Sequence, residues 1–189
     1  MDSPIVVVSK KSGDIRICVD LRRPNEAIIP DKYPLPNIEE LLSELNGAKV
    51  FSKIDLKSAY HQVDLHEDSR PLTTFITHDG LYRYKRVCFG LASAPSCFQK
   101  MMSMLLGDIH GVQCFLDDII VYGKDKAEHD KTLHAVLTKL TDYNVTLNDK
   151  CIFEVPSIQV LGHVIDSKGM HPNPDLSLNI WTNYIHLLD

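Results

Sequence analysis

The chain has 189 residues, of which 44% are apolar, 7% aromatic and 24% charged. This composition excludes disordered, collagen-like and low-complexity proteins, and no run of about 18 uncharged apolar residues is present that could span a membrane. The formal net charge of −5 argues against non-specific nucleic-acid binding through overall charge, so such a function would require a local site. Five cysteines without C-x-x-C spacing indicate reduced intracellular thiols.

Hydrophobic periodicity and turn residues predict short strands and helices in mixed order. The predicted strands are residues 5–8, 15–19, 50–55, 73–77, 81–87, 112–115, 119–122 and 160–165. The predicted helices run from Asn37 to a stop at Gly47, from Pro95 through Leu105, and from about Lys126 to Tyr143. Because strict βαβ alternation is absent, the order favours an α+β fold over a doubly wound parallel sheet.

Three acidic residues are the most informative feature of the sequence. Asp117 and Asp118 lie between two apolar strands, and Asp55 ends another apolar strand. Desolvating paired carboxylates costs several kcal/mol per ion unless a cation or hydrogen bonds compensate, although a surface turn avoids this cost. Three carboxylates at neighbouring strand ends suit two divalent ions about 3.5–4 Å apart, which serve in-line phosphoryl displacement.

The motifs around these acids resemble those of reverse transcriptases, in the form found in gypsy-type LTR retrotransposons. Residues 115–118 (FLDD) resemble the aromatic-x-Asp-Asp motif, and residues 51–62 resemble the first metal-binding motif. Further matches are residues 33–36, 89–95, 98–99 and 161–165. The resemblance covers about residues 4–174, with the motifs in the order of the family.

This resemblance implies an α+β right-hand polymerase core of fingers and palm, with an antiparallel palm sheet backed by helices and the thumb largely absent. The implied reverse transcriptase domain comprises residues 1–168, with the fingers at about 1–30 and 63–93 and the palm at about 31–62 and 94–168. Residues 169–189 are expected to be a divergent C-terminal tail or the truncated start of a thumb.

The implied function is that of an RNA-directed DNA polymerase, the reverse transcriptase of a Pol polyprotein. It would add deoxynucleotides to a primer 3′-hydroxyl by two-metal phosphoryl transfer. The implied cofactors are two Mg²⁺ ions, for which Mn²⁺ can substitute. The implied partners are an RNA or DNA template with an annealed primer and deoxynucleoside triphosphates, without a membrane and in an undetermined oligomeric state. The expected location is intracellular, in a cytoplasmic retrotransposon particle, with the nucleus as an alternative.

The family's site residues carry over position by position. Asp55, Asp117 and Asp118 match the catalytic, metal-binding carboxylates, and Tyr60 matches an aromatic gate that excludes a 2′-hydroxyl by collision. The other implied nucleotide-binding residues are Lys10 (or Lys11, at the same hairpin tip), Arg16, Leu56, Ser58, Ala59, Phe89 and Lys150. The implied primer-template residues are Leu161, Gly162, His163, Arg83 and Arg86. The two arginines belong to a stretch whose charges are all positive, which could serve template phosphates or form a solvated hairpin.

Other interpretations remain open from the residues alone. The whole chain could be a catalytically inert, truncated retroelement remnant that keeps the palm fold as a nucleic-acid or protein binding module. A palm-type nucleotidyl cyclase is disfavoured by the motif at 89–95. His129 and His134 miss the i,i+4 spacing of a helical zinc pair and are expected to be solvated or satisfied. Met101, Met102 and Met104 are expected to fill the core.

Overall fold

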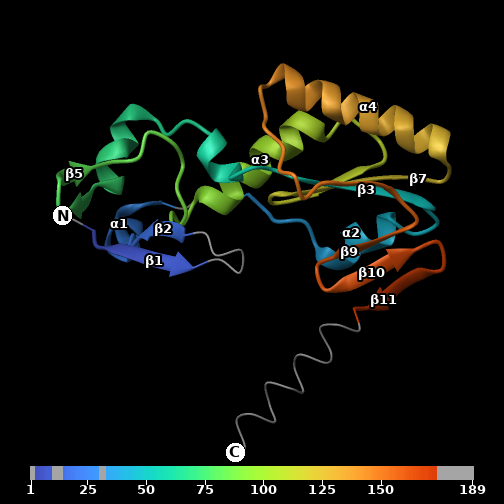
Figure 1. Cartoon of the computed structure of the whole chain (residues 1–189), viewed down its shortest axis with the longest axis horizontal. Helices are drawn as coiled ribbons and strands as arrows, with labels where there is room; N and C mark the ends of the chain where they lie inside the picture. The colour runs from blue at the N-terminus through green and yellow to red at the C-terminus, as the bar shows by residue number, and fades with distance from the viewer. Residues whose placement is uncertain (1–2, 10–14, 30–32, 174–189) are drawn as a thin grey trace, which may run out of the picture. The chain divides into compact units, whose positions relative to one another are not determined.

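A computed structural model describes residues 3–9, 15–29 and 33–173 of the chain (Figure 1). The chain forms two compact units, one made of residues 1–35 and 57–103 and the other of residues 36–56 and 104–189. Both units combine helices with antiparallel strands, which confirms the predicted α+β class. No helix in the described ranges is both long enough and apolar enough to cross a membrane.

Two small hairpins and short helices form the first unit. β1 (Ile5–Ser9) pairs antiparallel with β2 (Ile15–Val19), as predicted, and β4 (Phe75–Thr77) pairs with β5 (Gly80–Tyr82). The helical segments are α1 (Arg22–Ala27), the 3₁₀ helices η1 (Ala59–Gln62) and η2 (Glu67–Thr73), and most of α3 (Ala94–Leu106). Buried Val19, Leu21 and Cys88 form the small core of this unit.

The strand predicted over residues 81–87 is shorter than expected, because it ends at Tyr82. The backbone N–H of Tyr84 donates to Thr73 Oγ1 (3.0 Å) instead of continuing the ladder. Residues 85–87 then pair with residues 63–65 through backbone hydrogen bonds of 2.9 and 3.0 Å. The prediction of a strand over residues 81–87 is therefore wrong beyond Tyr82.

Helix α3 begins as predicted, with Pro95 in its first turn. Phe98, Met102 and Leu106 are buried because their i,i+4 spacing places them on one face. Met101 and Met104 are 39% and 79% exposed, so of the three methionines expected in the core only Met102 lies there.

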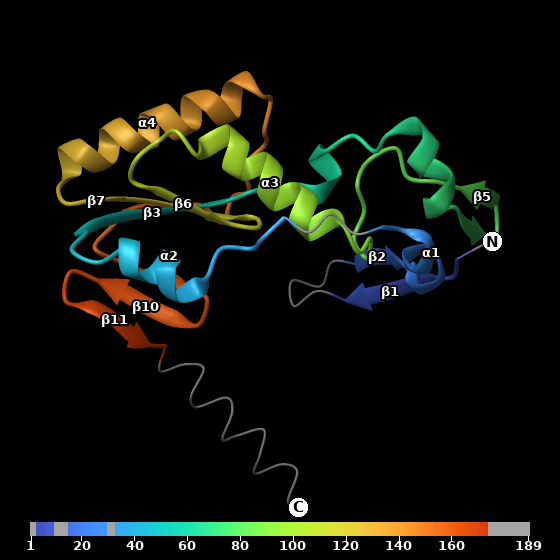
Figure 2. The same cartoon turned by 180° about the vertical axis from the view of Figure 1, so that it is seen from behind.

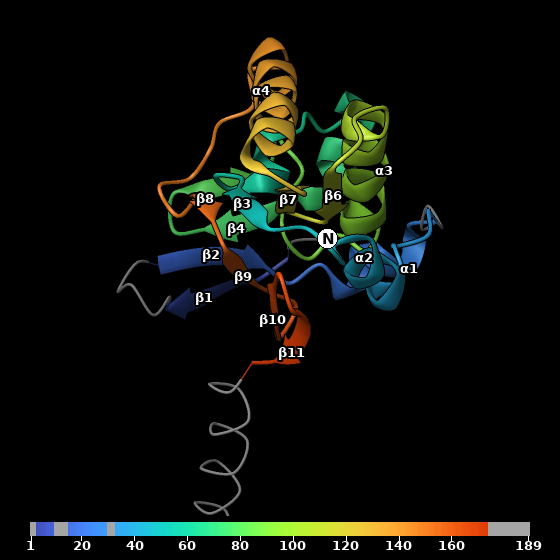
Figure 3. The same cartoon turned by 90° about the vertical axis from the view of Figure 1, so that its right-hand side faces the viewer.

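A four-stranded antiparallel sheet of order β6–β7–β3–β8 is the centre of the second unit. Its strands are β3 (Val50–Asp55), β6 (Val112–Phe115), β7 (Asp118–Gly123) and β8 (Ile152–Val155). Helix α4 (Lys126–Asp142) covers one face, whereas α2 (Ile38–Glu44) and a second sheet lie on the other face (Figures 2 and 3). Both faces of the sheet are therefore covered, so its inward side chains must be apolar or hydrogen-bonded.

The second sheet has the order β11–β10–β9, and its strands are β9 (Ser157–Val160), β10 (His163–Asp166) and β11 (Gly169–Pro172). The prediction of one strand over 160–165 is wrong, because Leu161 and Gly162 form a two-residue turn. Both have positive φ, 48° and 84°, which suits the tight turn of a twisted hairpin. Residues 169–172, assigned to the tail from the sequence, pair with β10.

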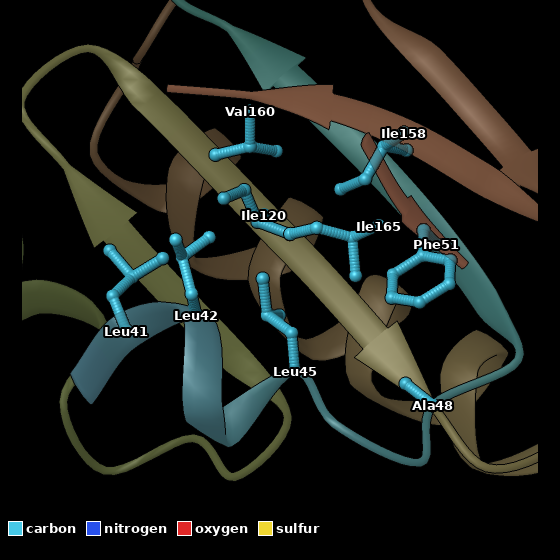
Figure 4. Close-up of a cluster of buried hydrophobic side chains, with 9 residues drawn as sticks. All are labelled: Leu41, Leu42, Leu45, Ala48, Phe51, Ile120, Ile158, Val160 and Ile165. Carbon is cyan, nitrogen blue, oxygen red and sulfur yellow. The ribbon is translucent and has the colours of Figure 1, made fainter. Parts of the chain in front are cut away.

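Between the two sheets lies an apolar core, drawn in Figure 4. Helix α2 reaches it in a fixed register, because the Asn37 side chain caps the helix by accepting from the Glu39 N–H at 3.1 Å. Phe51 of β3 and Ile120 of β7 are fully buried in this core. The full cluster is Leu41, Leu42, Leu45, Ala48, Phe51, Ile120, Ile158, Val160 and Ile165.

The opposite face of the sheet meets α4 through a buried polar network. Ser52 Oγ lies 2.9 Å from His129 Nε2, and His129 Nδ1 lies 3.1 Å from a carboxylate oxygen of Asp130. The backbone N–H of Glu154 on β8 donates to the same Ser52 Oγ at 3.1 Å. His129 is thus fully buried with both ring nitrogens satisfied, and Ser52 links β3, β8 and α4.

Ser52→Ala should lower the free energy of unfolding by about 1–3 kcal/mol, because it leaves a buried ring nitrogen and a backbone N–H without a partner. Urea unfolding of the whole chain would measure this change. Ser43→Ala, on the exposed face of α2, is the matched control and should stay within about 0.5 kcal/mol of wild type. Equal effects of the two substitutions would contradict the role given to the network.

Candidate active site

Two of the predicted carboxylates face each other across β3 and β7. Asp55, the last residue of β3, pairs in register with Asp118, the first residue of β7. Directly opposed residues of an antiparallel pair point to the same face, with Cβ atoms about 4.5–5.5 Å apart. By alternation this is the face that carries Phe51 and Ile120 into the apolar core. The acids therefore lie at the end of a firmly packed face.

The third carboxylate, Asp117, lies in the turn that joins β6 to β7. Because Phe115 pairs with Asp118, only Leu116 and Asp117 form the loop. Leu116 has a φ of 54°, a left-handed conformation that costs a residue with a side chain about 1–2 kcal/mol. The Asp117 side chain is exposed, so the turn presents it to solvent.

The charges of this turn reach the thiol of Cys114. Burial above all, and then the negative charges of Asp117 and Asp118, raise the pKa of Cys114 to about 12. The Cys114 thiol therefore stays protonated at neutral pH, and it donates to the Leu116 carbonyl at 3.4 Å. This hydrogen bond links Leu116, the residue with the left-handed backbone, to Cys114 in strand β6.

Two carboxylates directly opposite each other repel, and each has its own compensating partner. Lys53 Nζ donates to Asp118 Oδ2 at 2.8 Å, and the two side chains are 23% and 27% exposed. Asn148 Nδ2 donates to Asp55 Oδ1 at 2.9 Å. A cation thus balances one acid, while a neutral amide orients the other.

The residues described here contain no group of three His, Cys, Asp or Glu side chains already gathered for a metal ion. Asp55 and Asp118 are together, whereas Asp117 lies on the neighbouring turn and Lys53 and Asn148 each occupy one carboxylate oxygen. The set still fits Mg²⁺, because this ion takes one or two protein carboxylates and completes its octahedron with water and phosphate oxygens. The structure thus brings Asp55 and Asp118 together and leaves Asp117 on the adjoining turn, so the three-carboxylate metal site stays a prediction.

An aromatic group in the first unit contains two of the predicted nucleotide-binding residues. The ring centroid of Tyr60 lies 5.2 Å from that of Phe89 and 5.3 Å from that of Phe98, both in edge-on geometry. Ser58, just before η1, has a φ of 51°, and Ala59 is buried. The left-handed residue turns the chain into η1 and so orients Tyr60.

The remaining nucleotide-binding predictions are placed as follows. Leu56 is buried and forms an isolated antiparallel β-bridge with Leu147. Lys150 is exposed on the turn that follows Leu147. Arg16 pairs with Val8 in the β1–β2 ladder. Lys10 lies outside the described residues.

The primer-template predictions fall on a turn and on irregular chain. Leu161 and Gly162 form the β9–β10 turn, and His163 follows it, with Nδ1 3.2 Å from the Leu161 carbonyl oxygen. Arg83 is exposed. Arg86 is also exposed but pairs with Asp64 at 3.3 Å and donates to the Gln62 carbonyl at 3.1 Å.

Lys53, Asn148 and Cys151 also contact the two acids, although no sequence motif predicted them. Strand alternation could have found Lys53, which lies two residues before Asp55 and so on the same face. Asn148 and Cys151 contact Asp55 across more than ninety residues, and no local pattern signals that contact.

Comparison with known proteins decides the family. The model of the reverse transcriptase (RNA-dependent DNA polymerase) family matches residues 8–165. The chain belongs to the reverse transcriptase family. The predicted relationship to an LTR retrotransposon Pol polyprotein is confirmed by two sets of relatives, one from fly and one from fission yeast.

The chain is 39% identical over 181 residues to the Retrovirus-related Pol polyprotein from transposon 297 of Drosophila melanogaster, covering 92% of this chain and 17% of the relative. It is 36% identical over 172 residues to the Transposon Tf2-3 polyprotein of Schizosaccharomyces pombe, covering 89% and 13%. The reverse transcriptase chain therefore spans less than a fifth of the length of these polyproteins.

Solved structures confirm the fingers-palm fold. A foamy viral protease-reverse transcriptase in complex with double-stranded DNA matches with a TM-score of 0.90 at 24% identity, covering 96% of this chain and 32% of that one. The foamy viral enzyme in complex with an RNA/DNA hybrid matches with a TM-score of 0.87 at 24% identity, covering 96% and 25%.

Lys53→Met should lower the free energy of unfolding of this reverse transcriptase chain by about 1–3 kcal/mol in metal-free buffer, because Asp118 then faces Asp55 without its cation. Adding Mn²⁺ should recover part of the loss, since a divalent ion replaces the missing positive charge. Thermal unfolding with and without Mn²⁺ would measure both effects. The control is Lys131→Met on the exposed side of α4, and a Lys53 variant as stable as this control would contradict the prediction.

Proposed function

We propose that this chain is the catalytic core of an RNA-directed DNA polymerase, which extends a primer 3′-hydroxyl with deoxynucleotides on an RNA or DNA template. The observation that carries the proposal is the in-register pairing of Asp55 with Asp118 beside the turn that bears Asp117. In a chain of the reverse transcriptase family, this arrangement concentrates negative charge where phosphoryl transfer requires cations.

Asp55, Asp117 and Asp118 would hold two Mg²⁺ ions, for which Mn²⁺ can substitute. When bound, the ions supply activation of the primer hydroxyl and neutralisation of the charge on the transferring phosphoryl group. The chain's own residues prepare the site: Asn148 orients Asp55, and Lys53 offsets the repulsion between the two facing acids. The rigid register of β3 and β7 fixes the separation of those acids before substrate arrives.

Substrate recognition follows from the matched motifs. Lys10, Arg16 and Lys150 would bind the triphosphate, and Tyr60 would exclude ribonucleotides, with its ring held by Phe89 and Phe98. The β9–β10 turn at Leu161, Gly162 and His163 would position the primer, and Arg83 and Arg86 would face template phosphates. The complexes of foamy viral relatives with double-stranded DNA and an RNA/DNA hybrid support a primer-template partner. The proposed location is a cytoplasmic retrotransposon particle.

Asp55→Asn and Asp118→Asn should each lower primer extension by about 10²-fold or more, because loss of one charge weakens the hold on cations that stabilise the transition state. The assay is extension of a DNA primer on RNA and DNA templates with deoxynucleotides and Mg²⁺ or Mn²⁺. Asp142→Asn, an exposed acid at the end of α4, is the matched control and should extend primers like wild type. Equal extension by wild type, Asp55→Asn and Asp118→Asn would reject the proposed function.

Tyr60→Ala should admit ribonucleotides, since the bulk that excludes a 2′-hydroxyl is removed. We expect the preference for deoxynucleotides over ribonucleotides to fall by at least about tenfold, which corresponds to about 1.4 kcal/mol of discrimination. The measurement is kcat/KM for matched deoxy and ribo substrates on one template. Tyr60→Phe keeps the ring and should keep the preference, so a change of similar size in Tyr60→Phe would argue against a steric gate.

A further inference from the structure

A β-turn more than ninety residues further along the chain packs against Asp55. In residues 148–151, named here the Asp55 clamp, the Cys151 N–H donates to the Asn148 carbonyl oxygen at 3.3 Å. The preceding residue, Leu147, bridges Leu56, which is the residue after Asp55. The turn is therefore held directly alongside the end of β3.

The clamp contacts Asp55 at its backbone and at its carboxylate. The Asn148 N–H donates to the Asp55 carbonyl oxygen at 2.9 Å, and Asn148 Nδ2 donates to Asp55 Oδ1 at 2.9 Å. Cys151 Sγ accepts from the Asp55 N–H at 3.3 Å and lies 3.5 Å from the Asp55 carbonyl oxygen as a donor. These four contacts fix both the backbone and the side-chain torsions of Asp55.

The two facing acids accept hydrogen bonds from donors of different charge. Lys53 balances the charge of Asp118, whereas Asn148 gives Asp55 a charge-assisted hydrogen bond without neutralising it. Among the described residues, no side chain donates to the second oxygen of Asp55, Oδ2. A carboxylate with one oxygen held by a hydrogen bond and the other available suits a metal ligand supported by an outer partner.

We propose that Asn148 and Cys151 are positioning residues that orient Asp55 for divalent-ion binding before the ion arrives. This inference rests on the proposed function, because it assigns a purpose to the clamp only if Asp55 binds metal. Neither residue is assigned a contact with substrate. Lys150 occupies the exposed apex of the clamp, so the same turn sets the distance between the metal ligand and a lysine proposed to bind the triphosphate.

The sharpest variant is Asn148→Asp. Aspartate serves as well as asparagine at the first position of a β-turn, so the turn is kept while the donor to Asp55 becomes a repelling carboxylate. Asn148→Ala removes the donor alone, and Cys151→Ser keeps a group that both accepts and donates. Asn46→Ala, an exposed asparagine of the same unit, is the matched control.

The primary readout is Mn²⁺ binding to the purified whole chain without nucleotide, measured by electron paramagnetic resonance and by the Mn²⁺ concentration that gives half of the rise in Tm. We expect Asn148→Ala to weaken Mn²⁺ binding about tenfold, as removal of an outer partner of a metal ligand commonly does, and Asn148→Asp to weaken it at least as much. Cys151→Ser and Asn46→Ala should bind like wild type. In an Asp55→Asn background, Asn148→Ala should produce no further change.

Primer extension provides the second readout. The Mg²⁺ concentration for half-maximal rate should rise in Asn148→Ala, while KM for the deoxynucleotide at saturating Mg²⁺ stays unchanged. If Asn148→Ala and Asn148→Asp lower Tm but keep the wild-type Mn²⁺ and Mg²⁺ dependence, the clamp is only structural and the inference is overturned. If wild type neither binds Mn²⁺ nor extends primers, the proposed function fails and the inference fails with it.

Discussion

The juxtaposition of Asp55 and Asp118 is an unfavourable contact that the rest of the second unit must hold in place. Two like charges directly opposite each other destabilise an antiparallel pair. Slipping or separation of the strands at that end would relieve this repulsion. A slip by one residue would send every side chain of β3 to the opposite face. Ile120, two positions from Asp118, and Phe51, four positions from Asp55, are fully buried, so that slip would be costly.

The same register is also fixed from the other side of the sheet. Ser52 alternates with Phe51, so it points toward α4, where its hydroxyl bonds His129 and the N–H of Glu154. If β3 were displaced, this buried network would break and the apolar face would be exposed at the same time. Apolar packing on one face and hydrogen bonds on the other therefore hold the two repelling acids opposite each other. Neither of these interactions involves the acids themselves.

Local patterns in the sequence predicted the parts of this arrangement that local physics determines. The cap at Asn37, the apolar strands that flank the acids and the helix after Pro95 each follow from neighbours within a few residues. Two failures arose where residues outside the local segment override local propensity. Thr73 withdraws the Tyr84 N–H from the expected ladder, and Asn148 meets Asp55 across 93 residues. A motif could thus indicate which acids matter but not which residues hold them.

The charges at the site limit how far the chain alone can accommodate two divalent ions. In the part of the chain that the structure describes, the three carboxylates and the lysine that pairs with Asp118 carry a formal charge of −2, which balances one such ion. A second ion would leave an excess of positive charge in a partly buried site, where uncompensated charge is costly. In the proposed function, phosphate oxygens of a nucleotide would supply the missing negative charge, because Mg²⁺ readily shares them with carboxylates. The second ion would then enter with the triphosphate, while Asp55 and its neighbours would hold the first.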